Sequence, residues 1–328
     1  MPRQRMNGIH AEQVMRVRVI DLDGSVTSQE RLIRAFRPEV IDMRRTGPSL
    51  RLACRWSRFF RFEQRLDRLI DHDAGPAIHL LGSGDFHHLT LALLRRINQP
   101  FNLLVLDNHS DWVGGSPMLH CGSWLNHAAK LHNVRRIFHV GGDRGFDNRT
   151  RWLAPTDALR SGKIVTLPAV RTFNTGFWKH TPHQPLRARP EAIIDSERLE
   201  DVISPYLDDL DRWPLYVSLD KNVLWLPESI TNWDAGHLDM QEVREVLQFF
   251  LKASSDELAG MDIVGDWSEV QTRGIIQHLI HSMSHPKRAV DADQASLCNE
   301  HTNITLLNFL LSDPFVERRR MDAGHVNA

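Results

Sequence analysis

The chain has 328 residues, which is enough to bury a hydrophobic core in one α/β domain or in two small ones. Its 40 Lys and Arg against 41 Asp and Glu give a net charge of -1, which argues against nucleic acid or an anionic membrane as partner and favours a small molecule. Hydrophobic residues make up 41%, and no apolar run of about 18 residues occurs, so we expect a folded protein without a transmembrane segment.

The cysteines and the chain ends bear on location and domain organisation. Cys54, Cys121 and Cys298 show no metal-binding or redox spacing, and residues 1–14 lack the apolar centre of a signal peptide, so we expect a cytoplasmic protein. Neither end of the chain carries apolar periodicity. We therefore expect mobile tails at 1–14 and 314–328 around a single domain that spans 15–313.

Short apolar runs bounded by turn residues predict buried strands. In chain order these runs are residues 17–20, 77–81, 103–106, 137–140, 164–167, 215–219 and 261–264. Segments with helical spacing lie between most of them, at 89–97, 122–131, 196–210 and 240–252, and a last one follows at 302–311. This alternation predicts an α/β fold with a mainly parallel sheet and helices on both faces, in three layers.

Two segments do not fit that alternation. Residues 31–68 are rich in arginine and predict either helices or an irregular excursion, and residues 172–190 predict a long loop. Glu63, Asp67 and Asp71 are interspersed among the arginines, which favours a solvated helical face with ion pairs over an anion-binding patch.

Three candidate metal ligands follow the strand predicted at 103–106. Alternation along an extended chain points Asp107 and His109 the same way, and the next turn brings Asp111 back toward them. Carboxylate and imidazole groups together suit a divalent cation, with Mn(II) or Fe(II) favoured by many oxygen ligands and Zn(II) by a smaller set. A turn rich in capping residues is the alternative interpretation.

Similar residues follow two other predicted strands. After 77–81 the chain reads Gly-Ser-Gly-Asp-Phe-His-His, but the third glycine of a dinucleotide motif is missing and His87 and His88 stand where backbone amides would hold pyrophosphate. After 215–219, Asp220 and Asn222 point one way along the chain and Lys221 the other, so Asp220 is a further candidate ligand.

In these three motifs the chain resembles the arginase, agmatinase and formiminoglutamase group of ureohydrolases, as a divergent member. The family's G-G-D-H-S/T segment resembles residues 82–88 with one residue inserted, so that His87 matches the ligand and His88 is the alternative. The family's D-A-H-x-D matches residues 107–111, and its S-x-D-x-D matches residues 218–222 with Asn222 in place of the last carboxylate. The resemblance covers roughly residues 15–313 and implies an α/β fold with a dimanganese site.

The resemblance also implies a ligand set and a reaction. Two Mn(II) ions would share a hydroxide that attacks a guanidinium carbon, and urea would leave. The ligands implied for one ion are His87, Asp107, Asp111 and Asp220, and those implied for the other are Asp107, His109, Asp220 and Asn222.

The neutral amide of Asn222 lowers the negative charge that holds two dications about 3.5 to 4 Å apart, so we expect the second metal to bind more weakly. Two outcomes stay open. Asp266 could supply the lost charge to a dinuclear site, or a single Mn(II), Zn(II) or Fe(II) could be held chiefly by Asp107, His109 and Asp220, as in the related histone-deacetylase-type amidohydrolases.

Three further residues are candidates for catalysis or substrate binding. His120 resembles a family histidine that shuttles protons to the leaving amine, with a surface-loop histidine as the alternative. Gly265 stands where arginases and agmatinases commonly carry a glutamate that binds guanidinium, and Asp266 could act as a shifted carboxylate. Among five tryptophans near predicted strand ends, Trp267 is the best candidate to line a substrate pocket, the alternative being a core position.

These observations predict a metal-dependent hydrolase of linear, non-peptide C-N bonds in a guanidino or related amide substrate, with Mn(II) preferred. The expected partner is a small molecule, with neither nucleic acid nor membrane, and the resemblance implies a homo-oligomer. A noncatalytic metal-binding or ligand-binding protein is the alternative, because Gly265 and Asn222 replace residues that the family's chemistry uses.

Overall fold

The computed structural model describes residues 15–71, 75–142, 153–169, 196–255, 257–272, 274–285 and 289–312. The expected tails, and the loop expected at 172–190, lie outside these residues. Within them, eight strands form one parallel sheet. Their order across the sheet is β2 (Glu39–Asp42), β1 (Arg16–Asp21), β4 (Ala77–Gly82), β10 (Leu258–Val264), β9 (Leu215–Asp220), β5 (Phe101–Leu106), β7 (Val134–Val140) and β8 (Ile164–Leu167).

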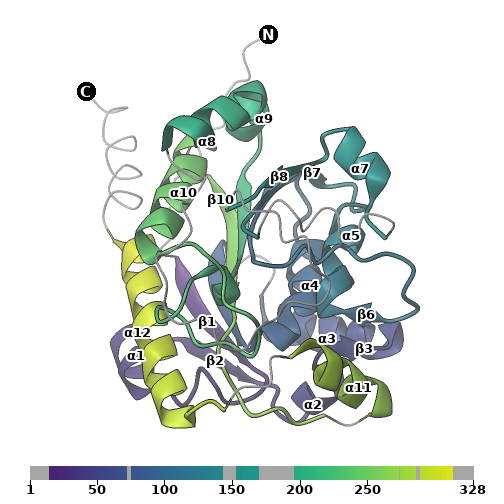
Figure 1. Cartoon of the computed structure of the whole chain (residues 1–328), viewed down its shortest axis with the longest axis vertical. Helices are drawn as coiled ribbons and strands as arrows, with labels where there is room; N and C mark the ends of the chain where they lie inside the picture. The colour runs from purple at the N-terminus through teal and green to yellow at the C-terminus, as the bar shows by residue number, and fades with distance from the viewer. Residues whose placement is uncertain are drawn as a thin grey trace.

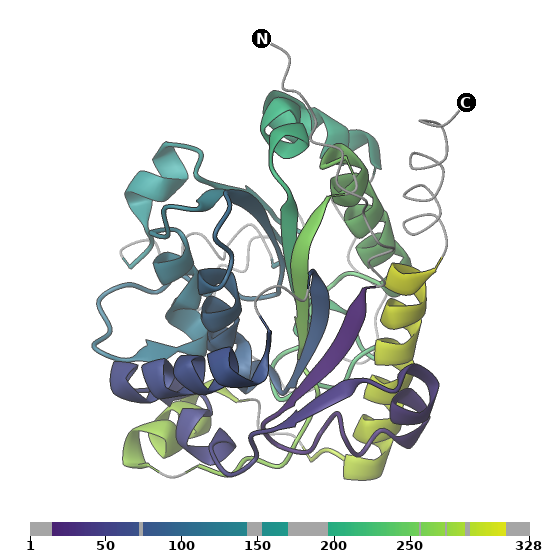
Figure 2. The same ribbon diagram turned by 180° about the vertical axis from the view of Figure 1, so that it is seen from behind.

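Helices cover both faces of this sheet (Figures 1 and 2), so the predicted three-layer α/β fold is confirmed. One face packs against α1 (Glu30–Phe36), α8 (Ser196–Ile203), α9 (Leu207–Arg212), α10 (Met240–Ala253) and α12 (Ala292–Leu311). The other packs against α2 (Gly47–Leu50), α3 (Trp56–Leu69), α4 (Thr90–Arg95), α5 (Trp124–Ala128) and α7 (Thr156–Arg160). Within the described part of the chain, none of the helices is both long and apolar enough to cross a bilayer.

The two faces bury alternate residues of each central strand. In β5, Leu104 and Leu106 belong to the core under α10 and α12, whereas Leu103 and Val105 belong to the core under α3 and α4. Since both faces of such a strand are covered, the sequence reads as an unbroken apolar run. Burying each of these side chains contributes about 1.5–3 kcal/mol to folding.

All seven predicted strands are present, and the structure adds others that the sequence did not reveal. The strand β2 lies at the sheet edge and buries only Ile41, so it has no apolar run to signal it. The two-residue strands β3 (Ala53–Cys54) and β6 (Leu119–His120) pair in antiparallel fashion outside the main sheet. Short edge strands depend on their neighbours rather than on their own pattern.

The arginine-rich segment forms α1 to α3, with β2 and β3 between the helices. Glu63 and Asp67 on α3 do form ion pairs, but their partners are Arg95 and Arg96 at the end of α4, outside the arginine-rich segment. A helix that the sequence did not predict, α11 (Ile275–Ser284), lies beside β3, where Gln277 Nε2 donates to the carbonyls of Arg51 and Ala53 at 2.9 Å each.

The register of the central strands determines where the site forms. Val264 at the end of β10 lies level with Gly82 of β4 on one side and with Asp220 of β9 on the other. On the far side of β9, Leu219 pairs with Leu106 of β5, so Asp107 follows at the level of Asp220. The chain therefore leaves four adjacent strands at one height, and their loops meet above the centre of the sheet.

Candidate metal centre

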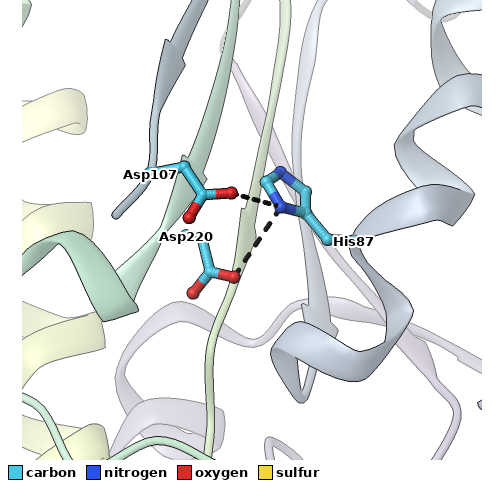
Figure 3. Close-up of side chains that lie close together, drawn as sticks. All are labelled: His87, Asp107 and Asp220. Carbon is cyan, nitrogen blue, oxygen red and sulfur yellow. Dashed lines mark ion pairs between the residues drawn. The ribbon is translucent and has the colours of Figure 1, made fainter. Parts of the chain in front are cut away.

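Side chains from three of these loops converge in a buried cluster. After β4, a 3-10 helix (η1, Gly84–Leu89) begins where the Ser83 side chain accepts a hydrogen bond from the backbone N–H of Asp85, and this helix carries His87. Figure 3 shows His87 of η1, Asp107 just after β5 and Asp220 at the end of β9 pointing toward one another. All three side chains are buried, the most exposed being Asp220 at 2%.

The distances suit a metal ion. His87 Nδ1 lies 3.1 Å from Asp107 Oδ2, 3.1 Å from Asp111 Oδ2 and 3.7 Å from Asp220 Oδ2. Among the described residues, His87, Asp107 and Asp220 form the group whose ligand atoms all lie within 4.8 Å of one another. One imidazole nitrogen and several carboxylate oxygens form a donor set that Mn(II), Fe(II) and Zn(II) all accept.

Two atoms of the cluster are buried without a hydrogen-bond partner, namely His87 Nδ1 and Asp107 Oδ2. They lie 3.1 Å apart, but the contact lacks hydrogen-bond geometry. A cation between them would satisfy both, so the residues present fit a metal.

Hydrogen bonds behind the cluster fix the orientation of the His87 ring. Ser218 Oγ donates to Asp262 Oδ2 at 3.0 Å, and His87 Nε2 lies 3.0 Å from the same hydroxyl oxygen. Since Ser218 has given its one proton to Asp262, His87 Nε2 must carry the proton that it shares with Ser218. With Nε2 held as the donor to Ser218, Nδ1 faces the carboxylates and presents a lone pair to a cation once its own proton is displaced.

The carboxylates of the cluster affect one another's protonation. Burial, followed by the charge of Asp107, raises the pKa of Asp111 to about 6 and that of Asp220 to about 7. Burial opposes the charged form of His87, but Asp107 and Asp111 outweigh it and raise the pKa of His87 well above its ordinary value. Without a cation the cluster therefore retains protons near neutral pH, and a dication would have to displace them.

Two glycines make room for Asp220. A Cβ atom at Gly84 would lie 2.7 Å from Asp220 Oδ2, and one at Gly265 would lie 2.5 Å from Asp220 Oδ1. Gly265 also has a φ of +99°, which other residues rarely adopt. A glutamate in place of Gly265 would therefore collide with the carboxylate of Asp220.

His109 and Asn222 lie next to the cluster and contact each other, with His109 Nδ1 3.0 Å from Asn222 Nδ2. The His109 side chain is 34% exposed, and its ring packs against Trp233 with centroids 5.3 Å apart. The carbonyl of His109 lies 2.8 Å from His139 Nε2, a contact that fixes the loop after β5.

The structure also distinguishes two neighbouring residues of the first motif and locates Asp111. His87 rather than His88 lies in the cluster, while His88 is fully buried and burial lowers its pKa to about 3. Asp111 has a left-handed backbone with φ of 49°, and its Oδ2 accepts a hydrogen bond from Trp124 Nε1 at 2.8 Å. Trp124 itself is a core residue with no exposed surface.

The structure does not bring the remaining predicted residues into the His87 group. Asp266 is 1% exposed and faces the interior, where its Oδ1 lies 2.9 Å from Lys221 Nζ and accepts from Gln29 Nε2 at 2.6 Å. Trp267 is half-buried in the following loop. His120 is half-buried at the end of β6, and burial lowers its pKa.

Two residues support the cluster from behind; Asp262 was missed from the sequence, and Ser218 was matched to a family motif without a role. Asp262 is a charged residue inside the otherwise apolar run of β10, and this is a signal that could have revealed it. Ser218 precedes Asp220 by two positions, so it shares a strand face with the ligand. Trp233 is one of the five tryptophans expected near strand ends, although the sequence favoured Trp267.

Comparisons with known proteins agree with this geometry at the level of the fold. No protein-family model matches the chain. An uncharacterized protein of Thermotoga maritima is 27% identical over 189 residues, which is 58% of this chain and 58% of that protein's length.

Three solved structures are similar over most of their length. Arginase from Bacillus subtilis has a TM-score of 0.53 and 13% identity, covering 92% of this chain and 99% of that one. Arginase from Bacillus cereus has a TM-score of 0.51 and 12% identity, covering 91% and 99%. Formimidoylglutamase from Bacillus subtilis has a TM-score of 0.52 and 12% identity, covering 92% and 87%. At such identities the similarity establishes the fold alone.

Proposed function

We propose that this chain, which has the fold of the ureohydrolases, is a metal-dependent hydrolase of linear, non-peptide C–N bonds. The observation that carries the proposal is the convergence of a His87 ring nitrogen with carboxylate oxygens of Asp107 and Asp220. This nitrogen, Nδ1, is directed at the carboxylates by the hydrogen bonds through Ser218 and is buried without a hydrogen-bond partner. A histidine held in this way beside carboxylates has the arrangement of a metal ligand.

A dication on His87, Asp107 and Asp220 would lower the pKa of water enough to supply a nucleophile near neutral pH. Mn(II) is the preferred ion because carboxylate oxygens dominate the donor set, with Fe(II) or Zn(II) as the alternatives. Ser218 and Asp262 hold the imidazole in place, and the buried setting of the three ligands excludes bulk water from behind them.

The side of the cluster on which His109 lies, here called its open side, is partly exposed to solvent, whereas the three ligands are buried. His109 is partly exposed and lies against Trp233, so both can contact a substrate that approaches the cluster. His120 is proposed as the group that carries a proton from the attacking water to the leaving amine. Burial lowers its pKa, so the ring is neutral at pH 7 and would accept the proton of the water before donating it to the amine.

The substrate is proposed to be a small guanidino or related amide compound. Gly265 provides no carboxylate for a cationic group, and Asp266 is paired with Lys221 in the interior. Recognition therefore falls to residues around the open side, with Trp267 as a further candidate. We propose no nucleic-acid or membrane partner, and we propose a homo-oligomer in the cytoplasm.

The test is a panel of guanidino, amidino and amide compounds offered to Mn(II)-loaded protein, with release of urea and of ammonia measured. We expect turnover of at least one class, and a loss of at least about 100-fold in turnover for His87→Ala. The matched control is His301→Ala, which removes an exposed histidine of α12 and should leave turnover unchanged. Metal binding without any turnover across the panel would favour the noncatalytic alternative.

A further inference from the structure

The amide of Asn222 has a defined orientation. Its Oδ1 accepts a hydrogen bond from the backbone N–H of Asn108 at 2.9 Å. A backbone N–H can only donate, so the carbonyl end of the amide must face Asn108. The NH₂ end is then the end that lies 3.0 Å from His109 Nδ1.

This orientation determines the state of His109. An amide NH₂ can only donate, so His109 Nδ1 accepts with its lone pair in that contact. Asp107 Oδ1 is farther from this nitrogen, at 3.5 Å, and accepts the backbone N–H of His109 at 2.8 Å, so the amide of Asn222 is the nearer partner. The lone pair that would bind a cation through Nδ1 is therefore engaged with Asn222, and the oxygen of Asn222 is engaged with Asn108.

The two histidines of the cluster thus differ. His87 Nδ1 is buried among carboxylate oxygens with no hydrogen-bond donor facing it, whereas the NH₂ of Asn222 faces His109 Nδ1. We propose that the site holds a single divalent cation, bound by His87, Asp107 and Asp220, and that Asn222 keeps His109 beside it as a hydrogen-bonding group and not as a ligand. The inference rests on the proposed metal site but not on hydrolysis.

A second consequence concerns the other nitrogen of His109. When Nδ1 accepts from Asn222, the proton of the neutral ring is on Nε2. The ring is 34% exposed and packs against Trp233. Asn222 therefore acts as a positioning residue. By holding Nδ1 of His109 as an acceptor, it leaves the Nε2–H of His109 free to donate to a ligand that binds on the exposed side of this ring.

The experiment is a determination of metal stoichiometry. Purified protein is equilibrated with excess Mn(II), free ion is removed by dialysis, and bound ion is counted by elemental analysis and observed by electron paramagnetic resonance. We expect one Mn(II) per chain with the signal of an isolated ion. Asn222→Asp removes the donor in front of His109 and adds an oxygen ligand, so it should bind a second Mn(II) and give a spin-coupled signal.

The matched control is Asn108→Asp. It adds the same charge to the half-buried side chain of the same loop while keeping the backbone N–H that orients Asn222. It should keep one ion, which separates a general effect of charge from a change at His109. Two ions in the wild-type protein, or no second ion in a folded Asn222→Asp variant, would overturn the inference.

A pair of alanine variants tests the ligand assignment separately, should Asn222→Asp fail to fold. His109→Ala should retain one bound ion, and His87→Ala should lose it. Loss of the ion in His109→Ala with retention in His87→Ala would refute the assignment. Counting bound ions needs no substrate. One bound ion in a protein without turnover would therefore contradict the proposed hydrolase function and still support this inference.

Discussion

Ser218 connects a buried carboxylate to the candidate ligand His87. Its hydroxyl donates to Asp262 and accepts from His87, so it determines which ring nitrogen carries the proton. Burial raises the pKa of Asp262 to about 6, which is still below neutral pH, so the group acts as an acceptor at pH 7.

Ser218→Ala should weaken Mn(II) binding by about 10–100-fold, because the His87 ring loses the partner that fixes its tautomer and orientation. Titration calorimetry with Mn(II) measures this. The control is Thr90→Val, which removes another hydrogen bond to Asp262, at 2.9 Å, without touching His87. It should cost about 1 kcal/mol of folding stability and change affinity much less. Equal losses in both variants would contradict the role assigned to Ser218.

The protonation of the carboxylates predicts how binding depends on pH. Burial and the neighbouring Asp107 raise the pKa of Asp220 to about 7 and that of Asp111 to about 6, so both hold protons more tightly in the folded ion-free protein. A cation must displace those protons, so Mn(II) affinity should rise by about tenfold per pH unit for each proton displaced as pH increases from 6 to 7. Calorimetry in buffers of different ionisation enthalpy counts the protons, and a flat profile would be inconsistent with this account.

At the scale of elements, the glycine after β10 controls the space around the end of β9. Gly265→Ala should destabilise the protein by about 1–3 kcal/mol through its positive φ and should also displace Asp220, since the new Cβ would lie 2.5 Å from Oδ1. Thermal unfolding and Mn(II) titration measure the two effects.

Gly24→Ala is the control for this variant. Gly24 has a similar φ of +80°, but nothing lies within 4 Å of its added Cβ. Gly24→Ala should lose folding stability because alanine disfavours this positive φ, and it should leave Mn(II) affinity unchanged. Intact Mn(II) binding in Gly265→Ala would mean that Asp220 is not confined in this way.

The elements that the sequence predicted are those in which apolar residues predominate, such as β4, β5 and β9. The helix α12 was predicted only from residue 302, yet it begins at Ala292, where the Asp291 side chain caps it. Its first half buries polar residues, among them Asn299 and Glu300, and Glu300 pairs with Arg31 of α1. Such polar contacts across the fold leave no apolar periodicity to detect.

The whole molecule brings the ligands together from distant parts of the chain. The motifs were sufficient to predict that His87, Asp107 and Asp220 meet, because parallel strands place their carboxyl ends at one edge. They could not predict that Asn222 faces His109 with its NH₂ end, because this depends on a backbone N–H of a separate loop. The sequence analysis expected Asp266 to bind the substrate, but this carboxylate pairs with buried Lys221 instead.

Because the candidate ligands come from β5, β9 and the helix after β4, a bound ion should stabilise the whole fold. Mn(II) at 100 times its dissociation constant should add about 2.7 kcal/mol to the free energy of unfolding. The melting temperature should rise with Mn(II) and return on adding a chelator. His87→Ala should remove the response, and a response that persists in that variant would place the stabilising ion elsewhere.

The level alignment of β9 with its neighbours also provides a check on assembly. A slip of one residue along β9 would exchange Asp220 for Lys221 and put an ammonium group where the carboxylate now lies. The misaligned molecule would repel the ion that the correctly paired molecule attracts. Metal present during folding would therefore stabilise the native register of β9 and not the shifted one, so ion binding would select the correct strand pairing.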